Sequence, residues 1–75
     1  MTVTVYVAPG CPGCTATQRK LDNLGVTYAT EPIDSIADQA RAAGIATAPV
    51  VQVGDEMWGG YRPDRLTALA AALVA

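Results

Sequence analysis

Residues 2–21 read TVTVYVAPGCPGCTATQRKL and contain the features on which the fold of the chain depends. Thr and Val alternate at the start of residues 2–7, a pattern typical of a β-strand. Pro9-Gly10 ends this strand, and the sequence predicts a helix from Pro12 to Leu24, with the proline in its first turn and a glycine just after its end. The four residues 11–14, Cys-Pro-Gly-Cys, therefore lie where a strand passes directly into a helix.

The remaining sequence predicts five further elements in the order strand, helix, strand, strand and helix. They cover residues 26–30, 33–44, 49–53, 56–58 and the segment from Pro63 to Val74. The crossover helix between the first two strands suits parallel pairing, whereas the turn at Gly54-Asp55 makes the last two strands antiparallel. We therefore expect a single α/β domain over residues 1–75, in which three helices cover both faces of a mixed four-stranded sheet. The order βαβαββα is that of the minimal thioredoxin fold.

Helical spacing also predicts which side chains face the core. They are Ala16, Thr17, Leu21 and Leu24 in the first helix, Ile36, Ala37, Ala40 and Ala43 in the second, and Leu66, Leu69, Ala70, Leu73 and Val74 in the third. Asp34 or Ser35 is expected to cap the second helix, and Gly44 to end it.

The composition excludes several classes of protein. The chain has a net charge of −2, no histidine and only five Lys and Arg, which do not form the basic face of a nucleic-acid-binding protein. No apolar run approaches the roughly 18 residues that span a bilayer, and the chain begins directly with its strand-like segment rather than with a leader. We therefore expect a cytoplasmic monomer with no membrane partner. In that compartment two cysteines three residues apart are catalytic or metal-binding rather than a permanent crosslink.

The cysteine pair is predicted to be a redox-active dithiol. The dipole and the unpaired N–H groups at a helix N-terminus stabilise a thiolate. Cys11 is expected at the exposed cap position, as the nucleophile that attacks a substrate disulfide, and Cys14 one turn inside, as the thiol that resolves the mixed disulfide. Pro12 removes one N–H donor, and Gly13 lets the backbone of a partner approach closely.

Other uses of the Cys-x-x-Cys spacing stay open. Small copper-carrying domains also begin with a strand, this motif and a helix, but they usually place Met two residues before the first cysteine, where this chain has Pro9, and they end on a strand. With no histidine and no third cysteine, the chain lacks the ligands of a four-coordinate zinc site. An iron–sulfur cluster shared between two subunits and a purely structural disulfide are the remaining alternatives. No glycine-rich nucleotide motif is present, so NADPH itself is not expected to bind.

The segment Thr47-Ala48-Pro49 is the second candidate part of the site. A proline that opens a buried strand needs a reason. In this fold the third strand begins opposite the helix N-terminus that carries the cysteines, and we expect a cis peptide bond between Ala48 and Pro49. The backbone groups of Ala48 would then face the dithiol, where a substrate segment could pair with them as a short added strand. These three residues, with Pro12 and Gly13, are the predicted substrate-binding set.

Four segments together resemble the NrdH-redoxins, the thioredoxin-like hydrogen donors of class Ib ribonucleotide reductase. The segments are Thr2-Val3-Thr4-Val5-Tyr6, Cys11-Pro12-Gly13-Cys14, Ala48-Pro49-Val50-Val51 and Trp58-Gly59-Gly60-Tyr61-Arg62-Pro63-Asp64. The resemblance covers essentially the whole chain. The last segment is similar to the family's W-S-G-F-R-P-[DE] signature and is the most specific of the four.

This resemblance implies a path for electrons. They would flow from NADPH through thioredoxin reductase to this protein, which needs no bound cofactor, and then to the large subunit of class Ib ribonucleotide reductase. Two departures lean toward glutaredoxins, which use Cys-Pro-Tyr-Cys and a Gly-Gly pair near the glutathione site. These are Pro12-Gly13, where the family commonly has Val or Met and then Gln, and Gly59, where it has Ser. A glutathione-dependent glutaredoxin is therefore the main alternative, although Ala8 stands where the usual basic residue would lie.

Residues 58–64 have two predicted roles. Trp58, Gly59, Gly60, Tyr61 and Arg62 are expected to form a partner surface, in which the two aromatic rings are either an apolar rim beside the dithiol or part of the core. Pro63 and Asp64 are expected to open the last helix, where a carboxylate favours the positive end of the dipole.

The position of Cys11 generates a first prediction. The helix N-terminus lowers the pKa of its thiol below the ordinary value of about 8.5, but only modestly, because Ala8 adds no positive charge and Pro12 no N–H. The rate of alkylation by iodoacetamide against pH measures this pKa. A midpoint below about pH 5 would show a far stronger activation than these residues supply.

Overall fold

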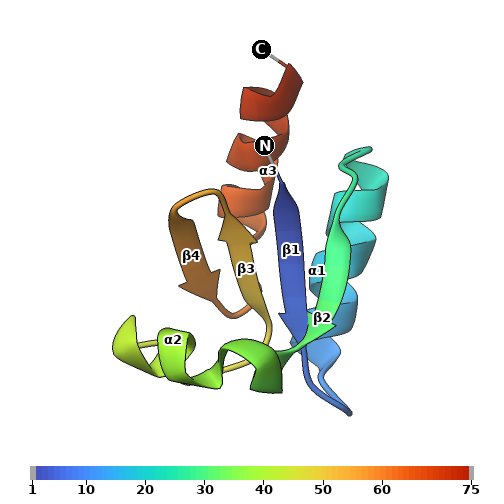
Figure 1. The fold of residues 1–75 in the computed structure, drawn as a ribbon. Coiled ribbons are helices and arrows are strands. Elements are labelled where there is room, and N and C mark those ends of the chain that lie inside the picture. Colours follow the sequence, from blue (N-terminus) through green and yellow to red (C-terminus); the bar gives the residue numbers. More distant parts are fainter. Residues whose placement is uncertain (1, 75) are drawn as a thin grey trace.

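The computed structural model describes residues 2–74 and has the predicted order of elements (Figure 1). The elements are β1 (Val3–Val7), α1 (Pro12–Asn23), β2 (Ala29–Pro32), the 3-10 helix η1 (Ile33–Ile36), α2 (Ala37–Ala42), β3 (Val50–Val53), β4 (Glu56–Gly59) and α3 (Pro63–Val74). None of these helices has the length and apolar character that a membrane-spanning helix requires.

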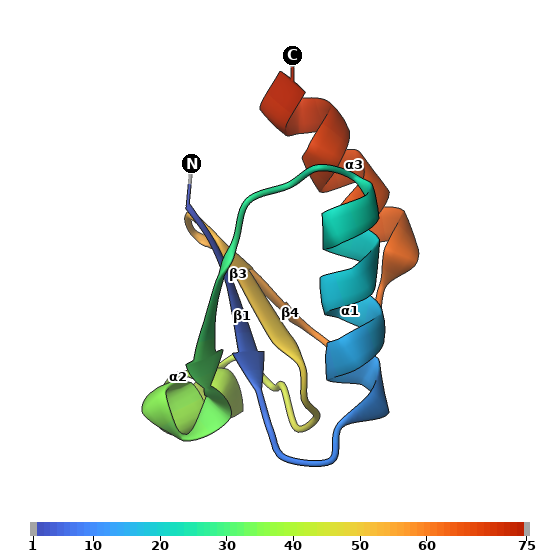
Figure 2. The same cartoon turned by 90° about the vertical axis from the view of Figure 1, so that its right-hand side faces the viewer.

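The four strands form one mixed sheet in the order β2-β1-β3-β4. β1 runs parallel to β2, with Val5 opposite Thr30, and antiparallel to β3, with Tyr6 opposite Val50. Because β1 and β3 run in opposite directions, the end of β1 lies beside the start of β3. The loop that leads to Cys11 and the loop that leads to β3 therefore meet at one end of the sheet, as Figure 2 shows. The predicted thioredoxin fold is confirmed.

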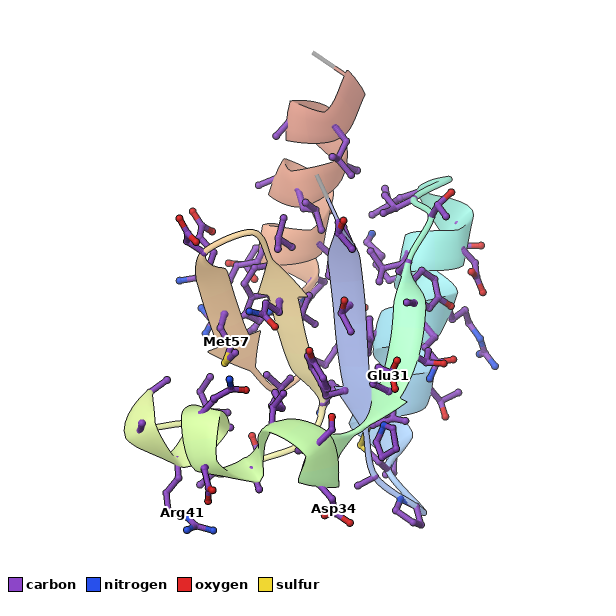
Figure 3. The ribbon with its side chains drawn as sticks, in the orientation of Figure 1. Glu31, Asp34, Arg41 and Met57 are labelled. Atoms are coloured by element: carbon purple, nitrogen blue, oxygen red, sulfur yellow. A yellow bond between two sulfur atoms is a disulfide. The ribbon has the colours of Figure 1, made fainter. Side chains whose placement is uncertain are left out.

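The two faces of the sheet bury separate cores. α1 and α3 cover one face, where the buried residues are Val3, Val5, Leu21, Val26, Val51, Val53, Trp58, Leu66 and Leu69. On the opposite face η1 and α2 bury Ile36, Ala40 and Val50, and Met57 points from β4 toward α2 (Figure 3). Leu21 and Leu66 are fully buried, and they anchor α1 and α3 against the sheet.

The second strand begins three residues later than predicted. The segment 26–28 is hydrogen-bonded to α1 and does not pair with β1, because the Val26 N–H donates to the Leu21 carbonyl at 3.0 Å. The Tyr28 hydroxyl donates to Asp22 Oδ1 at 3.1 Å. Burial, followed by this carboxylate, raises the pKa of Tyr28 above its usual value. Val26 is buried in the core with Leu21, and Tyr28 packs against the same core, so neither residue extends the ladder of β2. Alternation in the sequence does not distinguish these two arrangements.

The second predicted helix, residues 33–44, is divided into η1 and α2. No side chain caps either part, so the predicted cap by Asp34 or Ser35 is wrong; the Ser35 hydroxyl donates to the Pro32 carbonyl at 2.7 Å. The helix ends at Ala42, which leaves Ala43 exposed in the closing turn rather than inward as predicted.

The first and last helices follow the sequence closely. α1 begins at Pro12, and Thr17 and Leu21 are fully buried as expected. α3 buries Leu66 and Leu69, but Leu73 is 37% exposed because the helix has passed beyond the sheet that would cover it (Figure 1). The side chain of Val74, also predicted to face inward, lies outside the described residues.

Candidate active site

Cys11 occupies the N-cap of α1. Its backbone is extended, at φ −103° and ψ 103°, and Pro12 takes the first helical position. The Cys14 N–H donates to Cys11 Sγ at 3.1 Å, and the Thr15 N–H donates to the Cys11 carbonyl at 3.3 Å. The sulfur therefore takes the place that a Ser or Asp oxygen has at an ordinary helix start, where it accepts a hydrogen bond from the first turn of the helix.

Cys11 and Cys14 are joined by a disulfide, with their Cα atoms 5.2 Å apart. Cys11 is partly exposed, whereas only 3% of Cys14 is accessible. Cys11 is therefore accessible to a second protein, whereas Cys14 is not. This asymmetry results from the helix itself, since the cap residue faces outward and the residue one turn later faces the sheet.

The loop before β3 lies against the start of α1. The Ala48–Pro49 peptide bond is cis, as the sequence predicts, and Pro49 is fully buried. A Cβ placed on Gly13 would lie 3.2 Å from Pro49 Cδ, 3.9 Å from the Ala48 carbonyl oxygen and 4.0 Å from Tyr61 Cβ. Three parts of the chain therefore meet at Gly13, which lies between the two cysteines. The residues that meet there are Gly13, Ala48, Pro49 and Tyr61.

The glycine pair at 59–60 holds this loop from the other side. The Gly60 N–H donates to the Pro49 carbonyl at 2.8 Å, and a Cβ on Gly60 would lie 3.9 Å from Thr47 Oγ1. A Cβ on Gly59 would clash with Ile45 Cγ2 and would lie 3.3 Å from the Thr47 carbonyl oxygen. Ile45 thus fills the space beside Gly59. Sequence reasoning missed this contact, although an isoleucine two residues before Thr47 was a signal that the loop has an apolar anchor.

The remaining residues of the segment 58–64 are divided between core and surface. Trp58 is 7% exposed and packs in the main core, with the Arg65 guanidinium 5.3 Å above its ring. Tyr61 is 42% exposed and lies at the rim of the site. Arg62 Nε lies 3.8 Å from Asp64 Oδ1 in an exposed ion pair at the start of α3, which contributes little to stability.

Charged side chains near the dithiol end of the sheet are exposed. Glu31 on β2 and Asp34 on η1 lie at this end of the molecule (Figure 3). The polar groups that the structure places directly at Cys11 are the N-terminus of α1 and the N–H of Cys14. Within residues 2–74 no group of three or more His, Cys, Asp or Glu side chains is placed to hold a metal ion.

A thioredoxin fold that presents a Cys-x-x-Cys disulfide at the N-terminus of its first helix defines a thiol-disulfide oxidoreductase. Comparison with known proteins agrees with this class and identifies the family within it. The glutaredoxin family model matches residues 3–58, and the chain is 36% identical to the glutaredoxin-like protein NrdH of Escherichia coli K12 over 96% of this chain and 93% of that protein. The chain belongs to the glutaredoxin family, among its NrdH-redoxins.

Solved structures lead to the same family. The structure of NrdH-redoxin from Escherichia coli, described as having a thioredoxin-like activity profile, superposes with a TM-score of 0.83 at 36% identity, over 92% of this chain and 95% of that one. A glutaredoxin from Archaeoglobus fulgidus superposes with a TM-score of 0.73 at 29% identity, over 89% and 83% of the two chains.

The contact between Gly59 and Ile45 generates a prediction. Gly59→Ala should lower the free energy of unfolding by about 1–3 kcal/mol, because the added methyl group overpacks against Ile45. Ile45→Ala removes the clashing atom. The double variant should therefore lose at least about 1 kcal/mol less unfolding free energy than the sum of the losses in the two single variants. Urea denaturation of the four proteins measures this coupling.

Ile33→Ala provides the matched control. Ile33 packs, like Ile45, against the core formed by Ile36, Ala40 and Val50, but none of its atoms is among those nearest to Gly59. Its effect should add to that of Gly59→Ala. If the losses of unfolding free energy caused by Ile45→Ala and Gly59→Ala also simply add, the contact with Ile45 is not what makes Gly59→Ala destabilising.

Proposed function

We propose that this protein is a dithiol electron carrier in which Cys11 is the nucleophile and Cys14 the resolving thiol. The observation that carries the proposal is the asymmetry of the pair: Cys11 is accessible and accepts the Cys14 N–H, whereas Cys14 is 3% exposed. In the reduced protein the Cys11 thiolate attacks a substrate disulfide and forms a mixed disulfide. Cys14 then attacks Cys11 Sγ, which releases the reduced substrate and closes the Cys11–Cys14 bond.

The substrate segment binds along the Thr47-Ala48-Pro49 loop. Because Gly13 has no side chain, the start of α1 packs directly against this loop, where an added Cβ would lie 3.2 Å from Pro49 Cδ. One extended backbone can therefore reach both the Ala48 backbone groups and the dithiol. The exposed face of Tyr61, with Gly60 and Arg62 beside it, forms the rim of this surface. Trp58 and Gly59 support it from below through the core and through Ile45.

The electrons come from NADPH through thioredoxin reductase and pass to the large subunit of class Ib ribonucleotide reductase. Support for this route comes from the 36% identity to NrdH proteins across almost the whole chain. The thioredoxin-like activity profile attributed to the Escherichia coli relative points the same way. The protein would carry out this role in the cytoplasm as a monomer, with no cofactor of its own.

Reduction by glutathione is the second candidate function, because the glutaredoxin model matches the chain and Gly59-Gly60 resembles the glutathione-site pair. Glutathione carries two carboxylates, which need basic partners. Ala8 offers none beside the dithiol, and Arg62 already lies near Asp64. These features favour the thioredoxin reductase route.

The roles of the cysteines predict different results for two variants. Cys14→Ser should accumulate a mixed disulfide between Cys11 and the ribonucleotide reductase large subunit, because no thiol remains to resolve it. Cys11→Ser should form none, since Cys14 is buried. Non-reducing electrophoresis after incubation with the oxidised subunit measures the adduct. Trapping by Cys11→Ser at a similar yield would reverse the assignment.

The source of electrons is tested by oxidation of NADPH, followed at about 340 nm, with a protein disulfide as the acceptor. One reaction contains thioredoxin reductase, and the other contains glutathione with glutathione reductase. We expect turnover in the first reaction only. Turnover in the second alone would make the protein a glutathione-dependent glutaredoxin. The Cys11→Ser variant is the control in both and should be inactive.

A further inference from the structure

Among the described residues two buried side-chain polar atoms have no hydrogen-bond partner, Trp58 Nε1 and Thr17 Oγ1, and Thr17 lies on α1 just after the dithiol. It is fully buried, and its Oγ1 has no hydrogen-bond partner. Helical threonines commonly donate to the carbonyl three or four residues earlier. Thr67 of α3 does so, donating to the Pro63 carbonyl at 3.0 Å. Thr17 does not, although an unpaired buried hydroxyl is costly.

The position of Thr17 points to its missing partner. The buried stripe of α1 consists of Cys14, Thr17 and Leu21. Residues three apart on a helix are neighbours, with Cβ atoms about 5–6 Å apart, and helical side chains lean toward the N-terminus. Thr17 therefore leans toward Cys14, whereas Leu21 beyond it belongs to the apolar core.

We propose that Thr17 Oγ1 donates a hydrogen bond to Cys14 Sγ in the reduced protein and thereby stabilises the dithiol against the disulfide. This role rests on the proposed dithiol–disulfide cycle. In that cycle a donor dithiol gives two electrons and two protons to the Cys11–Cys14 bond, which breaks, and the donor becomes a disulfide. Cys14 Sγ gains electron density and becomes a better acceptor, and Thr17, three residues further along the same buried stripe of α1, has a hydroxyl without a partner that can donate.

The difference between the two redox states gives Thr17 its effect. In the oxidised protein the hydroxyl is buried without a partner, which destabilises the disulfide form. In the reduced protein the same hydroxyl is paired. Both contributions favour reduction, so Thr17 is a positioning residue that raises the reduction potential through Cys14. It need not touch the substrate, from which its burial separates it.

Thr17→Val and Thr17→Ser separate the hydroxyl from the packing. Valine keeps the shape and removes the hydroxyl, whereas serine keeps the hydroxyl and removes a methyl group. The Cys11–Cys14 equilibrium is measured in a dithiothreitol redox buffer, with alkylation and mass shift as the readout. We expect Thr17→Val to shift this equilibrium about tenfold toward the disulfide, equal to about −30 mV for a two-electron couple. Thr17→Ser should remain within about threefold of the unchanged protein.

Thr67→Val is the matched control, because it removes a threonine hydroxyl from the exposed side of α3 and should not alter the equilibrium. An unchanged equilibrium in Thr17→Val, with equal losses of unfolding free energy in the oxidised and reduced forms, would overturn the proposal and make Thr17 a packing residue. A shift of equal size in Thr17→Ser would also overturn it. The redox buffer needs no protein partner, so the result is independent of which reductase serves the protein. Failure of the unchanged protein to cycle in this buffer would instead refute the dithiol cycle itself.

Discussion

The hydrogen bond from the Cys14 N–H to Cys11 Sγ, at 3.1 Å, is the contact on which the rest of the site depends. It exists because a helix begins at Pro12 and leaves its first N–H groups without carbonyl partners. One sulfur takes the role of a capping atom at the surface, and the other is carried one turn into the protein. The fold then has to hold α1 against the sheet, which the fully buried Leu21 does in the last turn of the helix.

The antiparallel pairing of β1 and β3 provides the second half of the site. The strand that leads into Cys11 ends beside the strand that begins after Pro49, so two loops far apart in sequence share one end of the sheet. Their fit depends on the absence of side chains at two places. Gly13 leaves room for Pro49 and Tyr61, and Gly59 leaves room for Ile45. Substitution at either glycine would act on the site through packing rather than through the chemistry of sulfur.

Sequence reasoning predicted the fold, the position of the dithiol and the location of the second loop, because each depends on local signals. Pro12 and Gly25 delimit α1, and the order of elements leaves little freedom in topology. Prediction from the sequence was less successful where tertiary contacts outweigh the local pattern of apolar and polar residues. Val26 reads as the start of a strand but is bonded to the end of α1, and Ala43 reads as inward but follows the end of α2. The support that Ile45 gives to Gly59, and the unpaired hydroxyl of Thr17, depend on distances and burial that no spacing rule contains.

The free edge of β2 has a consequence for how the protein meets other chains. Its four residues, Ala29 to Pro32, are all exposed and include a carboxylate at Glu31 and a proline that lacks an N–H donor. Short edge strands that carry charge and proline pair poorly with foreign strands and so resist aggregation. Growth of the sheet by addition of a strand from another molecule is thereby discouraged along this edge, even though the backbone groups of β2 on that side have no neighbouring strand within residues 2–74.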